Sequence, residues 1–345
     1  MRCTNPIIIG GAGSSGSTLL VSILNRSKEI AAGPELSLLN KKYFFETPFS
    51  EIQKLKKHIL KRGKCTDGWF IYPRFFFSKY GFTDEEMDKM FSDAANQLEF
   101  IDLFFKNYLQ KEDKKIWAEK TPSNSYCFTQ LEALYPEARF IHIYRDGRDV
   151  VTSFIKRGMS PYFATMLWIY NTAHALRFRG RSNYYELRYE ELVYNPSKEV
   201  KKLCEFLDIP YNERLLRPDD EKKLEVDSWN HSPNQGIDSS SVGKYASYLE
   251  SFHYYCMKRS QISNKHKTVY GLQHGSFHEV QEALGYEGIA DTGLRSFPGS
   301  FIFGIRLLYL VVRDVLYRYY MLAKTRSVFP PYPGRIILNK RKVVQ

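Results

Sequence analysis

The sequence predicts an α/β protein with a P-loop-like parallel sheet flanked by helices. Apolar runs at 7–9, 139–144 and 184–189 are typical of buried strands, and a helical pattern follows each of them. Strands that alternate with helices form parallel sheets. The first run leads into a glycine- and serine-rich turn, which is typical of a phosphate-binding loop.

Composition allows one large or two modest domains in 345 residues. A hydrophobic content of 43% and an aromatic content of 15% are ample for a packed core. The formal net charge is +12, so we expect an anionic ligand or surface. We expect the main domain to occupy residues 1–290 and a basic extension to occupy 291–345.

Cysteine usage suits reduced thiols, because the cysteines are scattered and form no C-x-x-C pair. The five are Cys3, Cys65, Cys127, Cys204 and Cys256. The first strand begins within ten residues of Met1, so we expect no signal peptide. No apolar run has the length of a membrane span. Together these features predict a cytoplasmic protein.

Residues 11–18 read G-x-x-x-x-G-S-T, a phosphate-loop pattern with Ser17 where such loops carry lysine. Glycines let the backbone approach a ligand, and the first N–H groups of the following helix, expected over 17–26, point at it. Because that lysine reaches the terminal phosphates, we do not expect this loop to hold a nucleoside triphosphate. The alternative is a glycine-rich turn without a ligand.

Three segments lie between the first predicted helix and the strand predicted at 116–118. Gly33-Pro34-Glu35 predicts a turn that presents a carboxylate, although Glu35 could instead be a first-turn acid facing water. The stretch 41–80 is basic, aromatic and mostly helical in pattern. Thr83 and Glu86 form a capping box that predicts a helix start, and apolar spacing extends that helix to about Gln110.

Lys120 follows a predicted strand at 116–118, and Pro122 disfavours helix immediately after it. Open α/β sheets bind ligands where their strands end, so Lys120 is a candidate ligand contact. The alternative is a solvated lysine.

Arginines gather after the predicted strand at 139–144. Arg145 stands at its end, and Ser153 and Arg157 share one face of the helix that follows. Two guanidinium groups and a hydroxyl that converge suit a phosphate. The alternative is a salt-bridged helix start in which Arg148 and Asp149 pair locally.

Two further features, a strand histidine and a polar loop, can be interpreted from their residues. His142 is expected to pack within its strand. The polar, glycine-punctuated loop at 228–244 could wrap a ligand or could be a surface linker.

The C-terminal segment differs from the rest. Residues 301–323 are apolar with charged side chains towards one side, and residues 301–345 contain nine basic residues and one acidic residue. An amphipathic helix with a basic tail could lie on an anionic membrane. A core-packed terminal helix with a solvated tail is the slightly favoured alternative.

Four segments in order resemble the sulfotransferase family that uses 3′-phosphoadenosine-5′-phosphosulfate (PAPS). They are the lysine-less loop, Lys120-Thr121-Pro122, the strand and helix at 145–157, and the segment 187–192. The resemblance covers about residues 5–250 and is greatest to the tyrosylprotein and bacterial carbohydrate branch. One departure is Ser14, where the family usually has arginine or lysine.

The resemblance implies a donor site whose product is 3′-phosphoadenosine-5′-phosphate (PAP). The loop would hold the 5′-phosphosulfate, Arg145 and Ser153 would hold the 3′-phosphate, and other residues would add contacts. The implied donor-binding residues are Ser14, Ser15, Gly16, Ser17, Thr18, Arg145, Ser153, Arg157, Tyr189 and Lys244.

The resemblance also implies a mechanism. Glu35 would take the proton of an acceptor hydroxyl, and Lys120 and Ser232 would stabilise the transferring group. The acceptor could be a sugar, lipid, tyrosine or small molecule, and no metal and no nucleic acid partner is implied. A non-catalytic or P-loop-kinase-like nucleotide-binding protein is the alternative.

Overall fold

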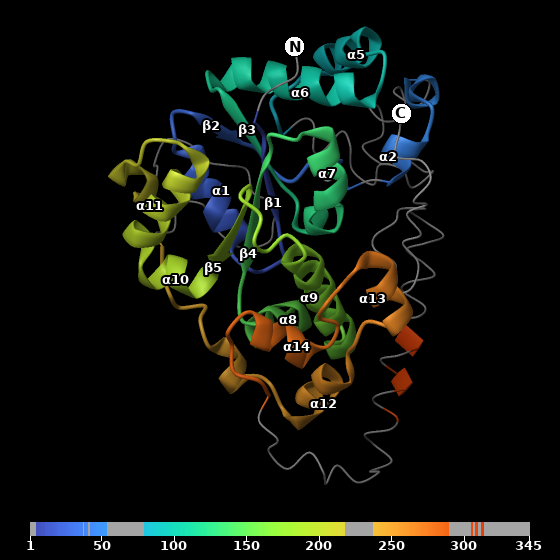
Figure 1. Cartoon of the computed structure of the whole chain (residues 1–345), viewed down its shortest axis with the longest axis vertical. Coiled ribbons are helices and arrows are strands. Elements are labelled where there is room, and N and C mark those ends of the chain that lie inside the picture. Colours follow the sequence, from blue (N-terminus) through green and yellow to red (C-terminus); the bar gives the residue numbers. More distant parts are fainter. Residues whose placement is uncertain are drawn as a thin grey trace.

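The computed structural model describes residues 5–36, 38–40, 42–53, 79–217 and 237–289, together with 305, 308–309 and 312–313 (Figure 1). A parallel five-stranded sheet lies at the centre with the strand order β2-β3-β1-β4-β5. The strands are β1 (Ile7–Gly10), β2 (Ile30–Ala32), β3 (Ile116–Lys120), β4 (Arg139–Tyr144) and β5 (Tyr184–Arg188). The α/β prediction is therefore confirmed.

The register of the sheet brings three loops together. Ile9 of β1 pairs with Lys120 of β3 on one side and with Ile141 of β4 on the other. Since all strands are parallel, the segments that follow β1, β3 and β4 leave from the same edge.

Helices cover both faces of the sheet (Figure 1). Ile7 and Ile9 pack with α1 and α11, whereas Ile8 points to the opposite face and packs with α6 and α7. This alternation follows from the two-residue period of a strand. The helices are α1 (Ser17–Asn25), α2 (Lys42–Glu46), α5 (Asp84–Asp93), α6 (Gln97–Glu112), α7 (Phe128–Leu134), α8 (Gly147–Lys156), α9 (Pro161–Leu176), α10 (Tyr189–Tyr194), α11 (Pro196–Leu207), α12 (Ser251–Arg259), α13 (Asn264–Tyr270) and α14 (Phe277–Ala283), with 3₁₀ turns η1 (Pro122–Cys127), η2 (Glu213–Leu216) and η3 (Lys244–Ser247).

A second packed cluster lies beside the sheet. It joins α8 and α9 to α12 and α14, with Trp168 and Phe277 fully buried within it. Because residues from 249 to 286 belong to this cluster, the chain after the last strand is built into the same body that carries the arginine-rich helix α8.

The predicted helix at 83–110 is wrong in one respect, because it is two helices. The capping box at Thr83 is confirmed, but the first helix ends where Ala94 turns to extended backbone. Asn96 then begins the second helix, and its side chain accepts a hydrogen bond from the Glu99 amide. A side-chain acceptor placed within the apolar repeat favours a new N-cap over a continuous helix.

Boundaries elsewhere differ slightly from the prediction. The strand predicted at 116–118 extends to Lys120, and Tyr189 begins α10 instead of ending a strand. Most of the stretch 41–80, Ser232 and most of the C-terminal extension lie outside the described residues. The division at residue 290 stays a prediction.

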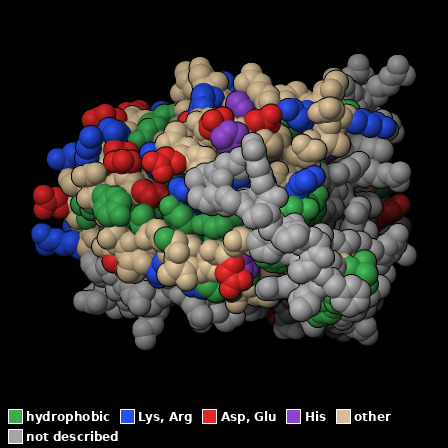
Figure 2. All heavy atoms as spheres, turned by 90° about the horizontal axis from the view of Figure 1, so that it is seen from below, with side chains coloured by type: hydrophobic (Ala, Val, Ile, Leu, Met, Phe, Trp, Pro, Cys, Tyr) green, Lys and Arg blue, Asp and Glu red, His purple; other side chains and the backbone are tan. Residues whose placement is uncertain are grey.

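Three further findings complete the description. Within the described ranges no helix is both long and apolar enough to cross a membrane. Cys204 is a free, buried thiol. Figure 2 shows basic and acidic side chains interspersed among the coloured residues of one face, so the positive charge does not form a single patch there.

Candidate active site

The loop between β1 and α1 has the backbone of an anion site. Gly16 is the N-cap of α1 with φ of 91°, and a Cβ there would lie 2.3 Å from the ring of Tyr189. Gly11 has φ of 147°, and a Cβ would lie 2.3 Å from the carbonyl oxygen of Ile143. Both positions therefore require glycine. Within the described residues no side chain caps α1, so the N–H groups of its first turn can face an anion.

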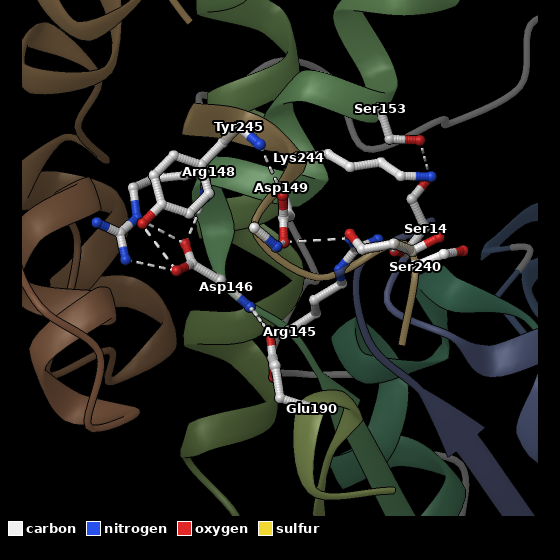
Figure 3. Close-up of polar contacts among 12 residues, drawn as sticks. Ser14, Arg145, Asp146, Arg148, Asp149, Ser153, Glu190, Ser240, Lys244 and Tyr245 are labelled. Carbon is white, nitrogen blue, oxygen red and sulfur yellow. Dashed lines mark hydrogen bonds and ion pairs between the residues drawn. The ribbon is translucent and has the colours of Figure 1, made fainter. Parts of the chain in front are cut away.

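Arg145 lies against this loop, as the sequence predicts (Figure 3). Its guanidinium donates to the carbonyl oxygens of Ser14, at 3.2 Å, and of Ser241. It also pairs with the carboxylate of Asp149 at 3.2 Å and lies over the ring of Tyr189 at 4.8 Å. Arg145 is therefore fixed between the loop and the segment around residue 241.

The local pairing of Arg148 with Asp149 is wrong. Asp149 faces inward, where it accepts hydrogen bonds from the amides of Gly243, at 2.8 Å, and Tyr245, at 2.9 Å. Arg148 pairs instead with Asp146, the N-cap of α8, at 2.6 Å. Since Asp149 is buried, it fastens the segment at 243–245 to α8 (Figure 3).

Ser153 also reaches the loop, and Arg157 contacts Ser153. The Ser153 hydroxyl donates to the Ser14 hydroxyl at 3.1 Å, and Arg157 donates to Ser153 at 3.3 Å. Burial lowers the pKa of Arg157, and the carboxylate of Glu35 opposes that shift, so Arg157 is within electrostatic reach of Glu35. The Lys244 side chain extends towards Ser14 and Ser153 in Figure 3.

Two polar atoms at the loop are suited to a ligand. In the described part of the chain the Ser15 hydroxyl and the Nε atom of Arg145 are buried and have no hydrogen-bond partner. Buried polar atoms without partners are rare in native proteins. Both lie in the segments predicted to hold phosphate groups, so these residues fit an anionic ligand such as a phosphorylated nucleotide.

Glu35 and Lys120 form an ion pair on the other side of the loop. The Nζ atom of Lys120 lies 2.5 Å from Oε1 of Glu35. The side chain of Lys120 is 7% exposed and that of Glu35 is 40% exposed. The solvated-lysine alternative is therefore wrong, and Glu35 lies in the turn after β2, outside any helix.

Glu119 is a residue that the sequence reasoning missed. Its carboxylate is fully buried and accepts hydrogen bonds from the Leu36 amide at 3.1 Å, from the Thr121 hydroxyl at 2.6 Å and from the side-chain amide of Asn124. Burial raises its pKa. An acid inside an apolar strand next to a candidate lysine is the signal that could have identified it.

The structure also places His142, Ser17 and Thr18. His142 is buried in β4 with its Nδ1 atom 3.0 Å from the Tyr184 hydroxyl, and burial lowers its pKa to about 3, so the packed interpretation is confirmed. Ser17 and Thr18 begin α1, and Ser232 lies outside the described residues. The described ranges contain no group of three or more acidic, histidine or cysteine residues suited to a metal ion.

Comparison with known proteins gives one family. A model described as the Sulfotransferase family matches residues 6–213. Protein-tyrosine sulfotransferase 1 of Danio rerio is 24% identical over 220 residues, covering 61% of this chain and 55% of that protein. The protein-tyrosine sulfotransferase of Drosophila melanogaster is 24% identical over 221 residues, covering 61% and 39%. The chain spans about half the length of the curated relatives that it matches.

Two solved structures share the fold. The sulfotransferase domain from the curacin biosynthetic pathway has a TM-score of 0.58 at 18% identity, covering 84% of this chain and 100% of that one. The sulfotransferase domain from the Synechococcus PCC 7002 olefin synthase has a TM-score of 0.55 at 24% identity, covering 72% and 90%. At these identities the likeness concerns the fold.

Proposed function

The chain belongs to the sulfotransferase family, and from this premise we propose that it transfers a sulfuryl group from PAPS to an acceptor hydroxyl. The observation that carries the proposal is the pair of sites at one sheet edge. The Glu35–Lys120 ion pair follows β2 and β3, while Arg145 and Ser153 contact the loop after β1. A base with a cation and a phosphate-binding cluster are the two parts that such a transfer requires.

Donor binding would use the loop and α8. The N–H groups at the start of α1 and the Ser15 hydroxyl would hold the 5′-phosphosulfate, and the Nε atom of Arg145 with Ser153 would hold the 3′-phosphate. The bound donor supplies a sulfuryl group joined to its phosphate through a bridging oxygen. Lys244 would provide the cation that Ser14 does not, since its side chain extends towards Ser14 (Figure 3).

Catalysis would be divided between the two members of the ion pair. Glu35 accepts the proton of the acceptor hydroxyl while that oxygen bonds to sulfur and the bond from sulfur to the bridging oxygen breaks. Lys120 then stabilises the negative charge on the departing phosphate oxygen. General base catalysis of this kind contributes about 10²–10⁴-fold. Ser232 would assist Lys120, although it lies outside the described residues.

The acceptor we propose first is a tyrosine hydroxyl in a protein. The curated relatives carry the name protein-tyrosine sulfotransferase. The Glu35 side chain is 40% exposed, so an acceptor on a large molecule could reach it from solvent. Sugar, lipid and small phenolic hydroxyls are the other acceptors that the test must include.

Incubation of the full chain with ³⁵S-labelled PAPS and a panel of acceptors tests this proposal. The panel contains a tyrosine peptide, an oligosaccharide, a glycolipid and a small phenol. We expect the peptide to gain label, and we expect Glu35→Gln to slow transfer about 10²–10⁴-fold while PAP still raises the melting temperature. If the wild-type chain binds PAP but labels no acceptor, it is a non-catalytic nucleotide-binding protein. If PAP does not bind, the donor assignment is wrong.

We also propose that the C-terminal segment attaches this cytoplasmic enzyme to an anionic membrane. The described positions at 305–313 are helical, and four apolar side chains spaced like one helix face are 47–64% exposed instead of packed in a core. They are Ile305, Leu308, Tyr309 and Val312. Residues 301–345 hold nine basic residues and one acidic residue, a net +8 of the chain's +12.

Sedimentation with vesicles tests the membrane proposal. We expect the chain to sediment with phosphatidylserine-containing vesicles at low salt and to stay in solution with phosphatidylcholine vesicles. The matched variant Leu308→Asp should lose this binding without losing PAP binding. Equal binding by a chain truncated after residue 295 contradicts the proposal.

A further inference from the structure

We propose that Glu119 is a positioning residue that holds the turn carrying Glu35, so that the Glu35 carboxylate meets Lys120. This inference rests on the proposed function of Glu35 and Lys120. Glu119 does not reach the reacting groups itself. It acts through the backbone of the residue that follows Glu35.

Two consecutive residues of β3 bind two consecutive residues of the turn. The Lys120 side chain donates to the Glu35 carboxylate at 2.5 Å, and the Glu119 carboxylate accepts from the Leu36 amide at 3.1 Å. Neighbouring strand residues project to opposite sides, so the turn is held from two directions. This double contact fixes both the position and the orientation of Glu35.

The residue before Glu35 is fixed as well. The Tyr80 hydroxyl donates to the carbonyl oxygen of Pro34 at 2.7 Å, and a Cβ on Gly33 would lie 2.2 Å from the Tyr80 ring. The backbone on either side of Glu35 is therefore anchored. Since the Glu35 side chain itself is 40% exposed, its position depends on these anchors more than on packing.

The same carboxylate reaches the donor loop. The Asn124 side-chain amide donates to Glu119 and also to the carbonyl oxygen of Ile9 at 3.2 Å, close to where β1 enters the loop. The Gly11 amide in turn donates to the carbonyl oxygen of Pro122 at 3.0 Å. Glu119 thus links the turn of the base to the strand that leads into the phosphate-binding loop, and this link sets the spacing between base and donor.

Burial of this carboxylate has a cost that its hydrogen bonds offset. Glu119 is fully buried, and burial raises its pKa. A buried acid needs partners on its oxygens, and Leu36, Thr121 and Asn124 provide them. An apolar side chain would fill the same space but would leave the Leu36 amide unpaired. A variant that removes only the acceptor oxygens therefore tests the positioning role.

Three variants separate positioning from bulk structure. Glu119→Met keeps the volume and removes both oxygens, whereas Glu119→Gln keeps one acceptor oxygen for the Leu36 amide. Glu132→Met is the matched control, because it makes the same substitution at an acid of α7 that pairs with Arg181 and not with the turn of Glu35. Each is measured for kcat, for KM of donor and acceptor, for PAP affinity by calorimetry and for hydrogen exchange of the Leu36 amide.

We expect Glu119→Met to lower kcat about 10- to 100-fold, as misplacement by about 1 Å does. PAP affinity should stay within about twofold, and the Leu36 amide should exchange faster. Glu119→Gln should recover most of kcat, and Glu132→Met should stay close to wild type. If Glu119→Met does not fold, Glu119→Asp replaces it, because the shorter side chain withdraws its oxygens from Leu36 but keeps the charge.

Several outcomes overturn the inference. One is equal kcat for wild type and Glu119→Met, another is unchanged exchange at Leu36, and a third is parallel loss of PAP affinity and kcat. Failure of the proposed function gives a different pattern. The wild-type chain then sulfates no acceptor, while the exchange of Leu36 in each variant still reports whether Glu119 holds the turn.

Discussion

The Nζ atom of Lys120 lies 2.5 Å from the Oε1 atom of Glu35, although the two residues are 85 positions apart in the sequence. The sheet brings them together, because Ala32 pairs with Ala118 where β2 and β3 run side by side. Lys120 is almost fully buried, and a buried ammonium needs a partner. In the resting protein that partner is the group that we propose as the base.

Because Glu35 and Lys120 act as one unit, the losses of kcat in their single variants should not be additive in the double variant. We expect Glu35→Gln and Lys120→Ala each to lower kcat by about 10²–10⁴-fold. The double variant should lose little more than the worse single variant, since each change already disables the pair. Single-turnover rates with saturating PAPS check this expectation.

An additive double variant contradicts the shared role. Lys111→Ala is a matched control, because Lys111 pairs with Glu86 on the surface at 3.1 Å, away from the sheet edge. Exposed pairs of this kind contribute little, so its kcat should equal that of wild type.

The Asp149 carboxylate should govern donor affinity. It accepts from the amides of Gly243 and Tyr245 and pairs with Arg145, so Asp149→Asn removes a charge from all three contacts. Hydrogen bonds to charged groups contribute about 1.5–3 kcal/mol, so we expect PAP to bind about 10- to 100-fold more weakly. The effect on kcat at saturating donor should be smaller.

Calorimetry with PAP measures this change. Asp102→Asn provides the control, because Asp102 accepts a hydrogen bond from Tyr135 away from the loop and should leave PAP affinity unchanged. Equal PAP affinity for wild type and Asp149→Asn would show that the segment at 243–245 does not depend on Asp149.

Local sequence signals predicted much of this fold and site. The strand at 139–144 and the capping box at Thr83 match the structure, because apolar alternation and cap chemistry depend on neighbouring residues. The position of Arg145 at the loop was predictable for a similar reason, since it ends a strand that adjoins β1. These features require only local pattern and sheet topology.

Long-range partners of buried acids were not predictable in this way. Asp149 bonds to residues 94 and 96 positions further along the chain, and Glu119 bonds to an amide 83 positions before it. No local pattern shows which distant backbone amide a buried carboxylate will meet. The sequence therefore suggested only a local partner for Asp149, in the alternative that paired it with Arg148, and it gave no partner for Glu119.

Gly16→Ala should abolish donor binding. Gly16 has φ of 91°, and a methyl group there would lie 2.3 Å from the Tyr189 ring, so the variant meets both strain and overlap. Gly81→Ala is a matched control with φ of 73° and open space around the new methyl group. We expect Gly81→Ala to lose about 1–2 kcal/mol of stability through backbone strain alone and to bind PAP normally. Thermal shift with PAP checks both variants, and normal PAP binding by Gly16→Ala would contradict the proposed loop geometry.

Stability should fall on acidification, and His174 should account for part of the loss. His174 is buried in α9, and burial, aided by Arg177 and His266, lowers its pKa to about 3. Both ring nitrogens lack hydrogen-bond partners within the described part of the chain. Because the unfolded chain protonates this residue near pH 6.5 and the folded chain does not, acid favours unfolding.

The sign and size of this effect follow from linkage. The folded-state pKa is depressed, so the unfolded state binds more protons below pH 6.5 and the free energy of unfolding decreases as pH falls. One such histidine contributes about 2 kcal/mol between pH 7 and pH 5. We expect His174→Phe to reduce the pH dependence by that amount, measured as the difference in urea unfolding at the two pH values. Glu119, whose pKa is raised, acts in the opposite direction, but it is present in both proteins and cancels in the comparison. Identical pH dependence in wild type and His174→Phe would mean that His174 is protonated in the folded protein.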